Sequence, residues 1–198
     1  MLSNVLDEET GELMEYRKLR KNPNYRLLYR NSYAKEIRRL EQGMSGLVEG
    51  TNTIFFIEKT AVPADRWKDV TYGRIVVDYR PDKTDTYHTI ITVGGGRVNY
   101  PGDCGTTTVE LTTVNLLLNS IFSKLNAKSM TIDIRYFYLN TLMDQSEYMH
   151  LKLRNFPNSV VQHYNLVENT IRVVYAYVEI KQGMYGLPQE GLIDQQLL

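Results

Sequence analysis

Hydrophobic positions repeat every three to four residues in two stretches of the chain, and this is the spacing of an amphipathic helix. The first stretch is "SYAKEIRRLEQG" at 32–43, with Ser32 as the expected N-cap and Gly43 just beyond the helix end. The second is "TTTVELTTVNLLLNSIFSKL" at 106–125, where threonines and Glu110 precede the apolar run as capping residues. The second stretch predicts the best-defined helix of the chain. Its apolar face comprises Val114, Leu117, Leu118, Ile121 and Leu125.

Alternating and β-branched stretches predict the strands. "TIFFIEK" at 53–59 and "YGRIVVDYR" at 72–80 flank a polar connection, and we expect these two strands to form a hairpin. "KSMTIDIRYFYL" at 128–139 has the composition of a buried strand. "EYMHLKL" at 147–153 and "TIRVVYAYVEI" at 170–180 predict two further strands.

The remaining segments complete the predicted order. "PNSVVQHYN" at 157–165 predicts a short helix that opens at a proline, and "KQGMYGLPQEGLIDQQLL" at 181–198 predicts a turn followed by the start of a helix. Helices and strands do not alternate regularly, so the order predicts an α+β fold, with a mixed, largely antiparallel sheet packed on helices. Residues 1–31 are polar and contain "KNPN", and we expect a partly disordered lead before one domain at 32–198.

Composition agrees with a globular domain. The 198 residues are 42% hydrophobic and 23% charged, and 23 basic side chains balance 23 acidic ones. The charge is segregated, however, because 7–15 is acidic and 16–39 is basic with interleaved tyrosines. The basic segment can contact phosphates and stack on bases, or it can be a solvated amphipathic face, and the sequence leaves both interpretations open.

Several classes of site and location are excluded or unsupported. The single cysteine, Cys104, rules out an internal disulfide and a thiolate zinc site, and it favours a reducing compartment. His88, His150 and His163 have no ligand spacing, so we interpret them as structural. The glycines of "TVGGGRVNYPGD" at 92–103 are not followed by a phosphate-loop or dinucleotide fingerprint. No apolar run approaches the ~20 residues of a membrane span and no secretory signal is present, so we expect a cytoplasmic or nuclear protein without a membrane partner.

One carboxylate interrupts the strand expected at 128–139. Burying the charge of Asp133 costs several kcal/mol unless a metal ion or another cation compensates it, which makes Asp133 a candidate site residue. Alternatively, Asp133 turns to solvent at a sheet edge or pairs with Arg135, and the residues alone do not decide between these interpretations.

Four segments occur in an order that is far more specific than any one of them. They are "YGRIVVDYRP" at 72–81, "YPGDCGTTTVELTTVNLLLNSI" at 100–121, "IDIRYFYLN" at 132–140 and "VEIKQGMYGLPQEG" at 178–191. They resemble the fingers strand, the helix before the catalytic strand, the first catalytic motif and the following strand and turn of copia-type LTR retrotransposon reverse transcriptases. The resemblance covers 32–198. It implies the fingers and N-terminal palm of a right-hand RNA-directed DNA polymerase, incomplete at its C-terminal end, which acts on an RNA or DNA template–primer and deoxynucleoside triphosphates with Mg²⁺.

The resemblance also implies roles for five side chains. Asp133 would be one of the aspartates that hold the paired Mg²⁺ ions during an in-line displacement. Tyr138 would be the steric gate beneath the sugar of the incoming nucleotide, or alternatively a core aromatic. Arg74 would clamp the triphosphate with its bidentate guanidinium, and Lys68 would be its lysine partner. Gln189 would contact the nucleotide from a glycine-rich turn.

The sequence departs from the family's pattern in two places. The family places its other catalytic aspartates in an aromatic-x-Asp-Asp turn, but no Asp-Asp pair occurs here, so we expect the chain alone to be inactive. Glu190 stands where the family usually has a small residue, and its charge would oppose triphosphate binding. The alternative is a non-enzymatic remnant that serves as a nucleic-acid-binding or protein-interaction module. We further expect an incompletely covered long helix and self-association through an exposed palm surface.

Overall fold

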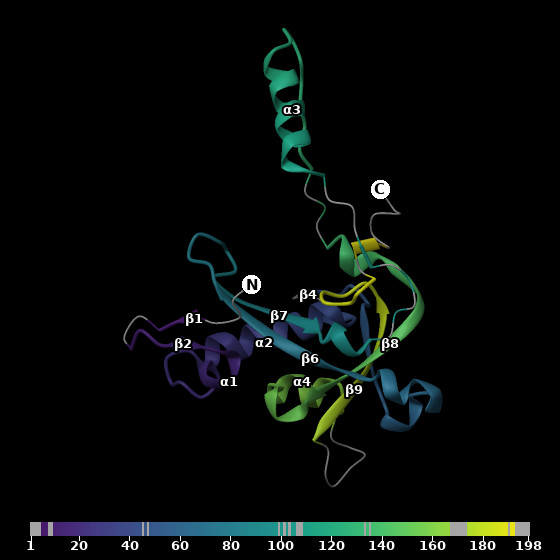
Figure 1. The fold of residues 1–198 in the computed structure, drawn as a ribbon. Helices are drawn as coiled ribbons and strands as arrows, with labels where there is room; N and C mark the ends of the chain where they lie inside the picture. Colours follow the sequence, from purple (N-terminus) through teal and green to yellow (C-terminus); the bar gives the residue numbers. More distant parts are fainter. Residues whose placement is uncertain are drawn as a thin grey trace.

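A five-stranded sheet at the centre of the molecule takes its strands from distant parts of the chain (Figure 1). The structure is a computed structural model in which the described residues are 5–7, 10–44, 46, 48–98, 100, 102, 104–105, 109–132, 134, 136–166, 174–189 and 191–192. In spatial order the strands are β5 (Ile54–Ile57), β9 (Tyr175–Gln182), β8 (Leu142–Lys152), β6 (Thr71–Tyr79) and β7 (Tyr87–Val93). With its helices the molecule is α+β, and the curled sheet is mostly antiparallel, as the sequence predicts.

One pair of strands is parallel, and it is short. β6 and β8 pair only where Thr71–Tyr72 lies beside Met149–His150. Beyond these residues β6 continues beside β7 as far as Tyr79, while β8 continues beside β9 as far as Lys152. The sheet therefore opens between β6 and β8, because each strand follows a different partner.

The predicted hairpin between 53–59 and 72–80 is wrong. β5 pairs with β9, and β6 forms its hairpin with β7, a strand that the sequence pattern did not predict. The polar connection after β5 folds into two 3₁₀ turns, η1 (Lys59–Ala61) and η2 (Ala64–Asp69). η2 is held beside β8, where Arg66 donates a hydrogen bond to the Ser146 carbonyl oxygen at 3.1 Å. The connection therefore does not reverse the chain as a hairpin turn would.

Helix α2 (Arg26–Leu40) covers one face of the sheet and also contacts α4 (Asn158–His163) (Figure 1). Alternate residues of the strands point to this face, and full burial of each large apolar side chain contributes about 1.5–3 kcal/mol. One polar group joins this core: Glu36 accepts hydrogen bonds from Arg39 and, at 3.3 Å, from the backbone N–H of Ile91. The buried side chains that meet here include Tyr29, Tyr33, Ile37, Leu40, Val77 and Ile91.

The structure differs from the prediction in residues 10–31, which are folded against this core. The tyrosines of the basic segment are the reason, because they supply apolar area: the ring of Tyr16 lies 5.2 Å from that of Tyr33, and Leu19 is fully buried. α2 consequently begins well before Ser32, the N-cap that the sequence predicts. The other elements near this end and after α2 are β1 (Val5–Leu6), β2 (Leu13–Met14), α1 (Tyr16–Leu19), β3 (Gly43–Met44) and β4 (Val48–Glu49).

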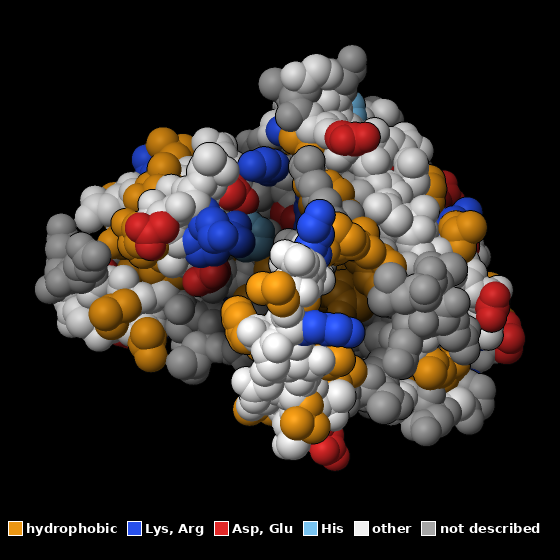
Figure 2. Space-filling view, turned by 90° about the horizontal axis from the view of Figure 1, so that it is seen from above, with side chains coloured by type: hydrophobic (Ala, Val, Ile, Leu, Met, Phe, Trp, Pro, Cys, Tyr) orange, Lys and Arg blue, Asp and Glu red, His pale blue; other side chains and the backbone are white. Residues whose placement is uncertain are grey.

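Helix α3 (Leu111–Phe122) forms where the sequence predicts it, but none of its residues is buried. It projects from the body of the molecule (Figure 1), and hydrophobic side chains are visible on the surface in the view from that end (Figure 2). The long helix is thus uncovered, as the sequence analysis expects, while self-association stays a prediction. Among the described residues, no helix is both long enough and apolar enough to cross a membrane. The most exposed large hydrophobic side chains of α3 are Leu111, Leu116, Leu117 and Phe122.

The strand expected at 128–139 is not found in the described residues of that stretch. Part of it instead forms the 3₁₀ turn η4 (Tyr138–Asn140), and Tyr136 before it has a positive φ of 57°. Ile132 is 70% exposed. A strand is stabilised by the backbone groups of a neighbour, and no described strand lies beside this segment. Asp133 lies outside the described residues.

Candidate functional site

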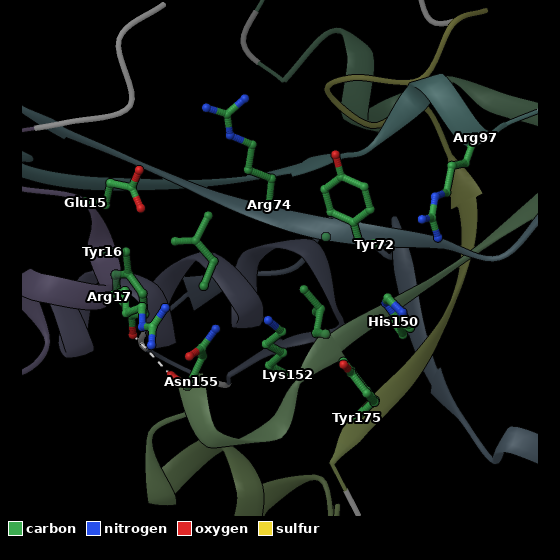
Figure 3. Close-up of a pocket in the computed structure, with 13 residues that line it drawn as sticks. Glu15, Tyr16, Arg17, Tyr72, Arg74, Arg97, His150, Lys152, Asn155 and Tyr175 are labelled. Atoms are coloured by element: carbon green, nitrogen blue, oxygen red, sulfur yellow. Dashed lines mark hydrogen bonds between the residues drawn. The ribbon is translucent and has the colours of Figure 1, made fainter.

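A cleft of about 490 Å³ opens where β6 and β8 separate (Figure 3). This volume is within the range of about 300–1,000 Å³ that is typical of ligand sites. Gly73 and Leu151 both line the cleft and lie in close contact, since a side chain at position 73 would clash with the side chain of Leu151. The N-terminal segment closes one end, where the Tyr16 hydroxyl donates a hydrogen bond to the Asn155 carbonyl oxygen at 3.1 Å.

The cleft is strongly basic. Arg74 of β6, Lys152 of β8, Arg97 of the 3₁₀ turn η3 (Gly95–Arg97) and Arg17 of α1 line it, and Glu15 is the single carboxylate among the described residues of its lining. Figure 3 shows Arg74 and Arg97 along the β6 side of the cleft, with Lys152 on the β8 side. Within the described part of the chain, Arg17, Arg97 and Lys152 form no ion pair. Their charges are therefore available to an anionic ligand.

Aromatic rings lie among these cations. Tyr72 of β6, His150 of β8 and Tyr177 of β9 are neighbours across three adjacent strands. The ring of His150 stacks on that of Tyr175, with the centroids 4.6 Å apart and the planes at 14°. Tyr72 is 46% exposed, and the guanidinium of Arg97 lies 6.0 Å from the centroid of its ring. In proteins that bind single-stranded nucleic acid, basic side chains contact the phosphates and exposed aromatic rings stack on the bases.

Three segments that are distant in sequence form a junction beside the cleft, which we call the motif junction. The rings of Tyr138 on η4 and Tyr185 in the turn after β9 lie 5.7 Å apart in a T-shaped arrangement. The carbonyl oxygen of Tyr185 accepts a hydrogen bond from the backbone N–H of Val93, at the end of β7, at 2.7 Å. Glycines allow this approach: a side chain at Gly183 would clash with the Tyr138 carbonyl oxygen, and Gly186 has a φ of 96°.

The glycine-rich loop after β7 connects the motif junction with the cleft. Gly95 lies directly against the carbonyl oxygen of Gly186, where no side chain would fit. The backbone N–H of Gly94 donates a hydrogen bond at 2.9 Å to the carbonyl oxygen of Tyr72, and Arg97 then reaches the cleft. The loop therefore places an arginine on the cleft without the sequence of a phosphate-binding loop.

The structure separates the residues to which the resemblance gives roles. Arg74 lines the cleft, and Tyr138 is 38% exposed at the motif junction. Lys68 is exposed on η2 and is not among the residues that line the cleft with Arg74, and its role as the lysine partner stays a prediction. Asp133 and its alternative partner Arg135 both lie outside the described residues.

Gln189 is buried, and its side chain is not presented to a nucleotide. It is 3% exposed, and its amide forms a hydrogen bond with the carboxylate of Glu147. Glu147 also accepts a hydrogen bond from Arg66 at 2.7 Å, and Arg66 donates another to Asp69 at 3.1 Å. Burial raises the pKa of Glu147, and the positive charge of Arg66 opposes this shift. Gln189 therefore belongs to a buried polar cluster that fixes the turn after β9 to β8.

The described residues contain no group of three or more His, Cys, Asp or Glu side chains that could hold a metal ion. Mg²⁺ was expected from Asp133 and its family resemblance alone. The expectation of Mg²⁺ stays a prediction, because Asp133 lies outside the described residues.

The cleft also holds side chains that the sequence alone did not single out. A signal for some of them was present, because in "MHLK" and "YAYV" the alternate positions are buried and the intervening ones are aromatic or basic. His150, which the sequence suggests to be structural, is on the same side as these intervening residues. The others are Arg17, Tyr72, Arg97, Lys152 and Tyr175.

Comparisons of the chain with protein-family models, with curated proteins and with solved structures find no match. A function can therefore be inferred only from the geometry of the cleft and the motif junction and from the motifs themselves.

Proposed function

We propose that this chain is the fingers and N-terminal palm portion of a copia-type reverse transcriptase, which positions a template–primer and an incoming deoxynucleotide. The motif junction is the observation that supports the proposal most. The segment that resembles the first catalytic motif contains Tyr138, the segment that resembles the next polymerase motif contains Tyr185, and Val93 ends β7, the strand that pairs with the fingers segment on β6. These three segments meet although they are far apart in the chain, as segments that share one nucleotide site must.

Tyr138 has the properties that a steric gate needs. Its ring packs edge-on against Tyr185, which holds the ring in place, and it remains 38% exposed to an incoming ligand. A rigid aromatic ring beneath the sugar excludes a 2′-hydroxyl by volume. Arg74 on β6 would approach the same ligand from the basic cleft, and its guanidinium can bind a phosphate in bidentate fashion.

The chain alone supports positioning rather than turnover. A two-metal displacement needs carboxylates from two structural elements, and the sequence contains no Asp-Asp pair to supply the second set. A second candidate function, a nucleic-acid-binding module without catalysis, is favoured by Arg17, Arg97 and Lys152, which form no ion pair among the described residues of the chain.

A labelled primer recessed on an RNA template tests the proposal by its rate of dissociation from the chain. We expect the next complementary deoxynucleotide to slow dissociation in the presence of Mg²⁺, and a non-complementary one to have no effect. Arg74→Ala should abolish the nucleotide effect. Tyr138→Ala should let the matching ribonucleotide act like the deoxynucleotide, while Tyr138→Phe, which keeps the ring, should preserve discrimination.

Two results would contradict this interpretation. If the complementary nucleotide does nothing although the template–primer binds, the polymerase proposal fails and the non-enzymatic module remains. If the chain alone extends the primer and Asp133→Ala abolishes extension, the expectation of inactivity is wrong.

A further inference from the structure

We propose that the cleft between β6 and β8 binds single-stranded nucleic acid, with phosphates on Arg17, Arg97 and Lys152 and a base stacked on Tyr72. The inference deepens the proposed function and rests on it only for the identity of the strand, which would be unpaired template. The surface itself is argued from the sheet.

The polar and aromatic side chains that β6 and β8 bring to the cleft lie on the face of the sheet that α2 leaves open. In β6, Val77 points to α2 and is buried, whereas Tyr72 and Arg74 occupy alternate positions and are exposed. In β8 the same alternation buries Leu151 and leaves Lys152 exposed. One face of this sheet is thus a core and the other is a surface open to a ligand.

The open face carries a row of rings that extends beyond the cleft. Tyr177 lies beside His150, with their centroids 6.3 Å apart, and the ring of Trp67 lies 5.7 Å from that of Tyr177. The ammonium group of Lys59 lies 5.5 Å from the centroid of Trp67, so the far end of the row is also cationic. The combination of rings and cations continues over β6, β8, β9 and η2.

This arrangement fits an extended polyanion that carries flat bases. Sheets that recognise single-stranded RNA present aromatic side chains on an open face, and bases stack on them while basic residues follow the backbone. A phosphate ion alone would use the cations but not the rings. A duplex keeps its bases stacked on each other, so their faces are not available to Tyr72.

Within the cleft, the described side chains carry more positive than negative charge. Of the residues that the structure describes, Glu15 is the one carboxylate that lines the cleft. Glu179, on β9 beyond Tyr177, is already paired with Lys181 at 3.5 Å. The three cleft cations without an ion pair therefore remain in excess.

Fluorescence anisotropy with a labelled oligothymidylate of about 15 nucleotides, long enough to cover one site, tests the inference over a range of salt concentrations. Tyr72→Leu should weaken binding about tenfold and leave the salt dependence unchanged, because stacking releases no counterions. Tyr72→Trp should retain binding. Lys152→Ala should weaken binding and lower the slope of log K against log salt by about one, because one phosphate contact is lost.

Two matched variants control for general effects. Tyr79 is 43% exposed on the same strand but outside the cleft, so Tyr79→Leu should leave binding unchanged. Lys35 is exposed on α2, which covers the opposite face of the sheet, and Lys35→Ala should also bind normally. Thermal melts followed by circular dichroism establish that each variant is folded.

Several outcomes would overturn the inference. Equal loss from Tyr72→Leu and Tyr79→Leu would show that the cleft is not the site, and equally tight binding of a blunt duplex would exclude recognition of single strands. If inorganic phosphate or vesicles with anionic lipid compete for Lys152 while Tyr72→Leu has no effect, the cleft is a simple anion site.

Normal oligothymidylate binding without any nucleotide effect on the template–primer would refute the proposed function and leave this inference standing.

Discussion

Glu41 is a buried carboxyl group at the end of α2, and its replacement by glutamine tests how the fold depends on pH. The side chain is 3% exposed, and its Oε1 accepts a hydrogen bond from the backbone N–H of Phe56 on β5 at 3.0 Å. Burial raises the pKa of Glu41 from 4.5 to about 7, although the Phe56 hydrogen bond opposes the shift.

The size and sign of the effect follow from this pKa. The change from 4.5 to about 7 is about 2.5 pH units, and at about 1.4 kcal/mol per unit it corresponds to about 3 kcal/mol. Because the pKa of Glu41 is higher in the folded than in the unfolded chain, its contribution to stability is fully present below pH 4.5 and is lost as the pH rises through about 7. Glu41→Gln cannot ionise, yet its side-chain oxygen can still accept the hydrogen bond from Phe56. The variant should therefore gain about 3 kcal/mol relative to the wild type across this pH range.

Urea unfolding followed by circular dichroism at a series of pH values measures the free energy of unfolding of both proteins. The difference between them isolates Glu41, because the other titrating groups are the same in each. Glu49→Gln is the control, since Glu49 lies on the neighbouring strand β4 but is exposed. A difference between wild type and Glu41→Gln that stays constant from pH 4.5 to 7 would refute the reasoning.

Three further substitutions test the packing. Arg66→Met keeps most of the side-chain volume but leaves the buried carboxylate of Glu147 and the partly buried carboxylate of Asp69 without their shared cation, so we expect a loss of about 3–5 kcal/mol in urea unfolding. Unchanged stability would mean that these ion pairs do not persist in solution. Leu117→Lys on the uncovered helix α3 should change the free energy of unfolding by less than about 0.5 kcal/mol, and it should reduce self-association in sedimentation experiments. By contrast, Ile37→Ala in the core should lower the free energy of unfolding by about 2–5 kcal/mol. A large loss from Leu117→Lys would show that α3 is packed in solution.

Elements with a strong local pattern could be predicted from the sequence. α3 forms within 106–125, and β8 includes most of 147–153. α4 lies within 157–165, with Pro157 as its N-cap. Each of these segments has its own periodicity or its own stop and start signals, so its local structure does not depend on knowing its neighbour. β9 was also expected, although within the described residues it begins only at Tyr175.

Strand pairing could not be predicted in the same way, because it depends on contacts between distant residues. β5 does not pair with the next long strand in sequence; it pairs with β9, more than a hundred positions later. A local signal for the true hairpin was nevertheless present at 80–86, "RPDKTDT", where Pro and Asp favour a turn between β6 and β7. The backbone N–H of Arg80 donates a hydrogen bond to the Thr86 carbonyl oxygen at 2.8 Å, which closes this turn.

The candidate site could likewise be predicted only in part. Family resemblance singled out Arg74 and Tyr138, and the structure leaves both exposed to ligands in neighbouring parts of the molecule. The cleft itself depends on the separation of β6 from β8, which no local pattern encodes. Arg97 and Lys152 become neighbours of Arg74 only through this separation, so their role could not be seen before the topology was known.

The segment around Asp133 shows why a strand-like sequence need not form a strand. β propensity measures how well a residue fits a pleated surface that is half covered by neighbours, so it cannot act without a neighbour. Ile132 and Ile134, on either side of Asp133, are 70% and 47% exposed, and no described strand lies beside them. The helix that precedes them in sequence, α3, is uncovered as well. Covering α3 and pairing this segment as a strand would each bury apolar side chains that are now exposed, so each needs a further surface that the described residues do not provide.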